Sequence, residues 1–156
     1  MIQRKLNLYL ESSVISMYFQ DNVPYLRDLT QQFWKDILPH FGVSISEIVL
    51  EEIRATTEPD LQKAFEILIS EFEVLQLTED TLKLSELYTS YRRLPRADAL
   101  HLASASMGGI DFLVTWNLRH LYKGGTQKMI REINTQLRIS IPIIVTPQDF
   151  LGEQVI

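Results

Sequence analysis

Apolar residues follow two alternating patterns along this chain: short continuous stretches, and longer segments in which they recur every three or four positions. The short stretches predict five strands, at residues 5–10 (KLNLYL), 41–45 (FGVSI), 73–77 (EVLQL), 111–116 (DFLVTW) and 141–145 (IPIIV). The longer segments predict helices at residues 24–38, 46–54, 60–72, 78–91, 95–107 and 126–137, with a helix start after Glu11 and a turn at 147–151. Strands that alternate with helices are typical of an α/β domain with a mainly parallel sheet.

Composition narrows the class of protein. The chain has 156 residues, a length that suits a single domain over residues 1–156. Cysteine is absent, which excludes disulfides, thiolate metal sites and thiol nucleophiles and suits the cytoplasm. No apolar run approaches the roughly 20 residues of a membrane span, and the stretch before Glu11 is too short for a signal peptide. We therefore expect a cytoplasmic protein with no membrane partner.

The charges are unevenly distributed. The net charge is −5, yet residues 92–138 contain eight basic and three acidic residues, so that this segment is positive and the remainder negative. One face of the protein could therefore bind a polyanion such as a nucleic acid. Ordinary solvated charge is the alternative interpretation, and the sequence leaves both open.

Most familiar catalytic signatures are missing. The chain contains no G-x-G-x-x-G, no P-loop motif, no H-E-x-x-H and no G-x-S-x-G. Its three histidines, His40, His101 and His120, do not have the spacing of zinc ligands. The sequence therefore does not support dinucleotide binding, P-loop chemistry or a serine-triad hydrolase.

Four polar side chains lie at the ends of predicted elements. Glu11 follows the first strand, Asn117 follows the fourth, Asp98 begins a helix, and Glu52 lies in the helix after the second strand. In an open parallel sheet, ligands bind beyond the carboxyl ends of the strands, where the strand order reverses. Oxygen ligands of this kind suit Mg²⁺ or Mn²⁺. Each residue alone also has an ordinary structural explanation, as a helix cap, a surface acid or a turn residue, so the interpretation depends on all four together.

Five segments resemble the motifs of PIN-domain nucleases of VapC type. They are LYLESSVIS (8–16), ISEIVLEEI (45–53), RADALHLA (96–103), LVTWNLRHL (113–121) and the closing VTPQDFL (145–151). The resemblance covers nearly the whole chain in the family's order, and it implies a three-layer α/β/α domain with a five-stranded parallel sheet of order 3-2-1-4-5. Two positions depart from the family pattern: Glu11 stands where Asp is commonest, and Asn117 where many members have Asp.

The resemblance also implies the site. Glu11, Glu52, Asp98 and Asn117 are the expected catalytic residues of a divalent-metal-dependent ribonuclease, with Mg²⁺ (or Mn²⁺) as its cofactor. Glu11 and Asp98 are expected to bind the metal, Glu52 directly or through water, and Asn117 to hold a water or orient a ligand. Because Asn117 removes one negative charge, two-metal chemistry is in doubt.

Other polar residues surround these four positions. Ser13 and Thr115 could hydrogen-bond the carboxylates, although local backbone bonds are as good an explanation. Arg119, His120 and Lys123 follow the fourth strand and could bind RNA phosphates, with a solvated loop as the alternative.

Two further side chains each have a functional and a structural interpretation. His101 lies three residues after Asp98, on nearly the same helix face, and is either a substrate contact or a satisfied buried histidine. Trp116 either stacks a base or belongs to the core.

Two function classes remain open. The first is a metal-dependent RNA endonuclease, the toxin of a toxin–antitoxin pair, with RNA as substrate, a cognate antitoxin as partner and a homodimeric state implied by the family. The second is a non-catalytic PIN-like RNA- or protein-binding module with a degenerate metal site. Three retained acids, Glu11, Glu52 and Asp98, favour the nuclease.

Overall fold

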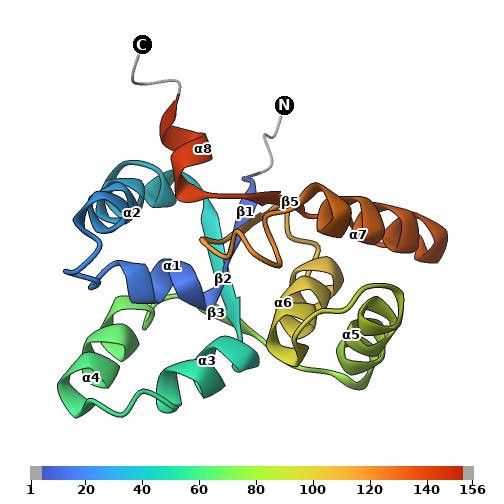
Figure 1. The fold of residues 1–156 in the computed structure, drawn as a ribbon, viewed down its shortest axis with the longest axis horizontal. Coiled ribbons are helices and arrows are strands. Elements are labelled where there is room, and N and C mark those ends of the chain that lie inside the picture. Colours follow the sequence, from blue (N-terminus) through green and yellow to red (C-terminus); the bar gives the residue numbers. More distant parts are fainter. Residues whose placement is uncertain (1–4, 153–156) are drawn as a thin grey trace.

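A parallel sheet runs through the middle of the fold (Figure 1). The computed structural model describes residues 5–152. In the sheet, five strands lie in the order β3-β2-β1-β4-β5, and every neighbouring pair is parallel. The strands are β1 (Asn7–Leu10), β2 (Gly42–Ser46), β3 (Glu73–Leu75), β4 (Phe112–Val114) and β5 (Ile143–Val145). The predicted parallel sheet and its order are therefore confirmed.

Helices cover both faces of this sheet. They are α1 (Ser12–Met17), α2 (Pro24–Asp36), the 3₁₀ turn η1 (Leu38–His40), α3 (Glu47–Arg54), α4 (Pro59–Leu68), α5 (Glu79–Tyr91), α6 (Arg96–Met107), α7 (Gly124–Leu137) and α8 (Pro147–Leu151). Figure 1 shows α1, α2 and α4 on one side of the sheet and α5, α6 and α7 on the other. The result is the predicted three-layer α/β/α arrangement.

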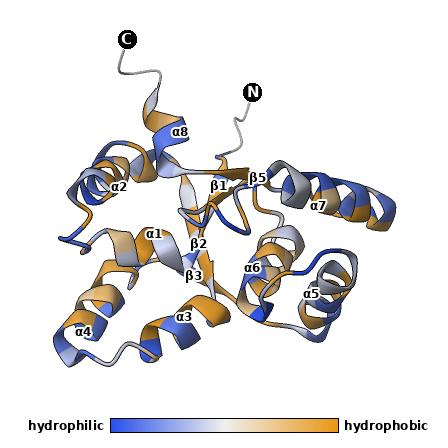
Figure 2. Ribbon diagram, viewed as in Figure 1, coloured by the Kyte–Doolittle hydropathy of each residue, from blue (hydrophilic) through white to orange (hydrophobic). Residues whose placement is uncertain are grey.

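The core lies where these layers meet the central strands. Leu8, Tyr9 and Leu10 of β1 are completely buried, as are Leu113 and Val114 of β4. A parallel sheet covered on both faces needs strands that are apolar throughout, which is why these strands read as continuous apolar runs. Figure 2 shows the same contrast, with hydrophobic strands inside and hydrophilic outer faces on several helices.

The pairing of β1 with β4 determines where the site forms. Leu10 is in register with Val114, and the backbone N–H of Glu11 donates to the Val114 carbonyl at 3.0 Å. The carboxyl ends of the two strands therefore lie side by side. β1 also pairs with β2, so the chain order reverses at this point of the sheet.

Several boundaries differ from the prediction. Residues 147–151, predicted as a turn, form α8, because Thr146 and Asp149 make a capping box at its start. The helix predicted to reach Leu38 ends at Asp36 and is followed by η1, which contains Pro39. A proline lacks the backbone N–H that a continuing α-helix requires. Within residues 5–152, no helix is long and apolar enough to span a bilayer.

Candidate metal centre

Glu11 occupies the junction between β1 and α1. It is the N-cap of α1, and its carboxylate accepts the backbone N–H of Ser13 at 3.1 Å. Its Oε1 atom also accepts the hydroxyls of Ser13 at 2.5 Å and of Thr115 at 2.6 Å. The residue is only 5% exposed, so these donors replace the water that the carboxylate loses. One carboxylate is thereby fixed at the end of the two central strands.

Ser13 and Thr115 are themselves held by the backbone of the fourth predicted motif. The Ser13 hydroxyl accepts the N–H of Trp116 at 2.8 Å, and the Thr115 hydroxyl accepts the N–H of Asn117 at 2.9 Å. Each hydroxyl thus links the Glu11 carboxylate to the segment that follows β4. Because each hydroxyl both donates to Glu11 and accepts a backbone N–H, these two side chains connect the first and fourth predicted motifs.

Glu52 reaches the same place from α3. Its Oε1 atom accepts the Ser12 hydroxyl at 2.7 Å and contacts Nε2 of His101 at 2.7 Å. The side chain is 38% exposed. Partial burial works to raise the pKa of Glu52, but the His101 hydrogen bond and charge and the Ser12 hydroxyl outweigh it and lower that pKa. Glu52 is therefore favoured as a carboxylate.

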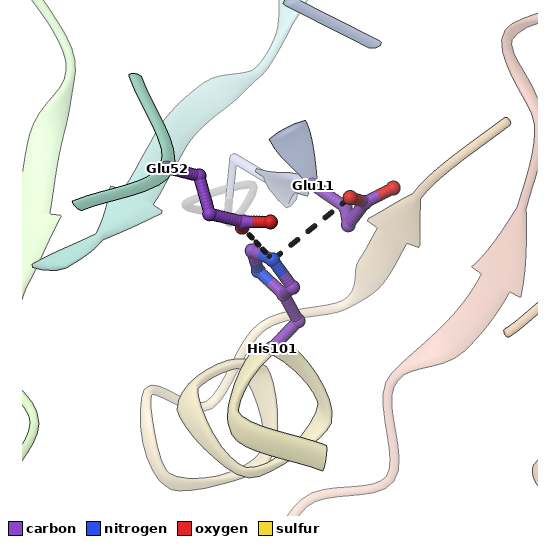
Figure 3. A group of neighbouring side chains, drawn as sticks. All are labelled: Glu11, Glu52 and His101. Atoms are coloured by element: carbon purple, nitrogen blue, oxygen red, sulfur yellow. Dashed lines mark hydrogen bonds and ion pairs between the residues drawn. The ribbon is translucent and has the colours of Figure 1, made fainter. Parts of the chain in front are cut away.

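His101 lies between the two glutamates, as Figure 3 shows. Its ring is completely buried in α6, and Nδ1 lies 2.7 Å from the hydroxyl of Tyr9. Nε2 faces the carboxylates and lies 3.9 Å from Oε2 of Glu11. One ligand atom from each of Glu11, Glu52 and His101 lies within 4.8 Å of the others, so the three form a mixed carboxylate–imidazole group.

This burial bears on the two interpretations of His101. A ring with no exposed surface and partners at both nitrogens has no edge for RNA, so the structure favours the satisfied buried histidine over a substrate contact. The sequence places His101 one turn after Asp98, but it does not show that this ring meets Glu52. The spacing of three residues on one helix is the only signal that connects it to the site.

Asp98 and Asn117 form a second pair beside this group. Asn117 Nδ2 donates to Oδ1 of Asp98 at 3.3 Å, and Asn117 Oδ1 accepts the backbone N–H of His120 at 2.9 Å. Burial, and then the charge of Glu11, raise the pKa of Asp98. The structure therefore brings Glu11 and Glu52 together with His101. It places Asp98 outside that group, bonded to Asn117 and within electrostatic reach of Glu11.

The remaining predicted residues lie on the loop between β4 and α7. Arg119 and Lys123 are exposed, and His120 is half-buried. Lys123 and Arg131 line a cavity of about 380 Å³ beside β5. Trp116 donates from its indole N–H to the Thr30 hydroxyl at 2.8 Å and packs against the core, which matches the core interpretation of this residue.

The donor set suits a divalent cation. Within the part of the chain that the structure describes, His101 is the only ionic partner recorded for Glu11 and Glu52, and no lysine or arginine neutralises them. A cavity of about 330 Å³ opens beside both glutamates and gives access from solvent. Converging carboxylates with an imidazole and no basic side chain are the ligands that divalent metals use.

Comparison with known proteins identifies the fold. No family model and no curated protein matches the chain. Several solved structures resemble it at low sequence identity. VapBC2 from Rickettsia felis bound to a promoter DNA fragment matches with a TM-score of 0.55 and 15% identity, over 90% of this chain and 98% of that chain.

DNA-bound VapBC from Salmonella typhimurium matches with a TM-score of 0.59 and 17% identity, over 91% of this chain and 98% of that chain. A toxin–antitoxin complex from Klebsiella pneumoniae matches with a TM-score of 0.60 and 17% identity, over 76% of this chain and 93% of that chain. At these identities the likeness concerns the fold. The chain therefore has a PIN-like α/β/α fold, which it shares with chains of toxin–antitoxin complexes, two of them VapBC.

Proposed function

We propose that this protein is a divalent-metal-dependent endoribonuclease, the toxin of a type II toxin–antitoxin pair. The observation that carries the proposal is the convergence of Glu11 and Glu52 at the reversal point of the sheet, where no lysine or arginine within residues 5–152 is recorded as their ionic partner. Buried or half-buried carboxylates that face one another are costly unless a cation joins them. The position is the one where open parallel sheets bind ligands.

The metal would be held by Glu11 and Glu52, with Asp98 beside them. A divalent ion supplies neutralisation of the scissile phosphate and activation of water. Ser13 and Thr115 fix the Glu11 carboxylate through their hydroxyls. Asn117 orients Asp98 through its amide group, since it offers a neutral hydrogen-bond donor where an aspartate would add repulsion.

The substrate proposal rests on charge. Arg119 and Lys123 are exposed on the loop that follows Asn117, within the positive segment 92–138. Positive side chains on this loop would bind RNA phosphates and position the RNA strand for cleavage. His120, half-buried beside them, is a further candidate for contact with RNA.

The partner proposal rests on the solved complexes. Since chains of this fold occur in VapBC toxin–antitoxin complexes, we propose a cognate antitoxin as protein partner. From the motif resemblance we also propose a homodimer, and from the cysteine-free composition a cytoplasmic location. Copurification of the chain with the product of a small neighbouring reading frame, followed by mass measurement of the complex, tests the antitoxin and the homodimer.

The activity test uses the purified chain and a mixed RNA pool. We expect cleavage with Mg²⁺ or Mn²⁺, none after treatment with EDTA, and recovery when the metal is restored. Internal fragments, rather than mononucleotides released from the ends, would identify an endonuclease. Unchanged RNA under all conditions, with RNA binding that is independent of metal, would instead identify the non-catalytic binding module.

A further inference from the structure

We propose that His101 is a direct metal ligand through Nε2, together with Glu11 and Glu52, and that the site therefore selects a first-row transition cation over Mg²⁺. This inference rests on the proposed function, because it names the cation for the same site. It differs from the all-oxygen site expected from the sequence, in which Glu11, Glu52 and Asp98 supply the ligands.

The first argument is geometric. Nε2 of His101 lies 2.7 Å from Glu52 Oε1 and 3.9 Å from Glu11 Oε2, and all three ligand atoms lie within 4.8 Å of one another. The ring comes from α6, whereas the glutamates come from α3 and from the end of β1, so the three converge from separate elements (Figure 3). Asp98, the acid expected in the third position, lies outside this group and bonds Asn117.

The second argument concerns the far side of the imidazole ring. A histidine that binds a metal through one nitrogen keeps a hydrogen on the other, which is usually donated to a fixed acceptor. Nδ1 of His101 has such an acceptor in the Tyr9 hydroxyl at 2.7 Å. The ring is completely buried, so its orientation is fixed before any metal arrives.

The hydrogen-bond chain behind the ring permits the required tautomer. At its 2.7 Å contact with Glu52, Nε2 is the donor, because a carboxylate only accepts. To bind a metal, Nε2 must release that hydrogen while Nδ1 carries one toward Tyr9. The Tyr9 hydroxyl lies 2.7 Å from the Ser46 hydroxyl, and either can be the donor. The direction of this hydrogen-bond chain can therefore reverse.

The third argument is the chemistry of the donors. Mg²⁺ prefers oxygen ligands in near-ideal octahedral geometry, whereas imidazole favours Fe²⁺, Co²⁺, Ni²⁺ and Zn²⁺. With a buried imidazole as ligand and Asn117 in place of a fourth acid, the site gains a nitrogen and lacks one anionic oxygen. We expect Mn²⁺ to bind at least about tenfold more tightly than Mg²⁺, and Co²⁺ more tightly than Mn²⁺, in the order of metal affinities for mixed donors.

Pulsed electron paramagnetic resonance of bound Mn²⁺ tests the ligand directly. We expect coupling to a ¹⁴N nucleus, replaced by ¹⁵N coupling when the protein is grown with ¹⁵N-histidine. His101→Gln should abolish it, whereas His40→Gln and His120→Gln should retain it. Tyr9→Phe should also retain it, because the ring remains a ligand after its hydroxyl partner is lost.

Each outcome decides the inference. Mn²⁺ bound without histidine coupling, or coupling that disappears in His120→Gln alone, would overturn it. If His101→Gln does not fold by circular dichroism, retained coupling in the two other histidine variants still assigns His101 by elimination. RNA cleavage with Mg²⁺ but no coupling would reject the imidazole ligand and leave the nuclease standing. Coupling without RNA cleavage would support the metal site and reject the nuclease.

Discussion

The hydroxyl of Thr115 donates to Oε1 of Glu11 at 2.6 Å, although 104 positions separate the two residues in the sequence. This bond is possible because β1 and β4 are neighbours in register, with Leu10 opposite Val114. It joins the acid that directly follows one central strand to the residue that directly follows the other. The Glu11 carboxylate is therefore positioned by the sheet pairing rather than by its own helix alone.

Replacement of Thr115 by valine tests this relationship. Thr115→Val keeps the shape of the side chain but removes the hydroxyl that bonds Glu11 and accepts the Asn117 N–H. We expect a loss of about 1–3 kcal/mol in the free energy of unfolding, and Mn²⁺ affinity about 10–100-fold weaker. Chemical denaturation and calorimetry measure the two effects. Thr115→Ser, which restores the hydroxyl, should recover most of both; equal affinity in all three proteins would show that the bond does not position a ligand.

Asp98→Asn should stabilise the metal-free protein. Burial and the charge of Glu11 raise the pKa of Asp98, so the folded state disfavours the carboxylate. For an acid whose pKa is raised on folding, stability falls as pH rises past the unfolded pKa and through the folded pKa. The variant should therefore melt above the parent in EDTA at neutral pH. The difference should shrink at about pH 3, where the unfolded carboxyl is mostly protonated.

Asp80→Asn is the matched control for this prediction. Asp80 also lies in the first turn of a long helix, α5, but it is exposed. Its replacement should leave the melting temperature unchanged or slightly lowered, because only a favourable helix-end charge is lost. If both variants behave alike, the stability effect comes from the helix end and not from the acidic site.

Asn117→Asp is expected to have the opposite effect. The Asn117 amide donates to Asp98, and a carboxylate in its place would repel Asp98 instead. We expect a lower melting temperature in EDTA and tighter Mn²⁺ binding, because the added charge is compensated only when the cation is bound. Melting curves with and without Mn²⁺ measure both. A variant that is less stable yet binds the metal no better would place Asn117 away from the cation.

Much of the fold is predictable from the sequence. Continuous apolar runs such as residues 111–116 identify central strands, and the motif resemblance supplies the sheet order. The convergence of Glu11 with Thr115 and Asn117 follows from the strand ends of a parallel sheet. Helix boundaries are less predictable, because they depend on caps such as the Thr146–Asp149 box that stand outside the apolar pattern.

The role of His101 could not be predicted from the pattern, for a physical reason. Every residue of α6 from Asp98 to Ser106 is buried. This helix therefore lacks the contrast between an exposed polar face and a buried apolar face that would show its orientation. Whether a ring on such a helix meets Tyr9, Glu52 or the far layer depends on how the helix is rotated in the fold. The apolar pattern likewise does not separate Glu52 from Glu51, since both are acids on a half-exposed helix, and only the motif resemblance selects Glu52.

The most direct measurement of the central claim compares the ribonuclease activity of Glu52→Gln with that of Glu51→Gln. Glutamine keeps an oxygen that can accept from Ser12 and His101, so the fold should be preserved while the negative charge is removed. With Mn²⁺ and a mixed RNA pool, we predict cleavage reduced on the order of 100-fold in Glu52→Gln and unchanged in Glu51→Gln. Cleavage by Glu52→Gln at the parent's rate would contradict the proposed metal-dependent nuclease site.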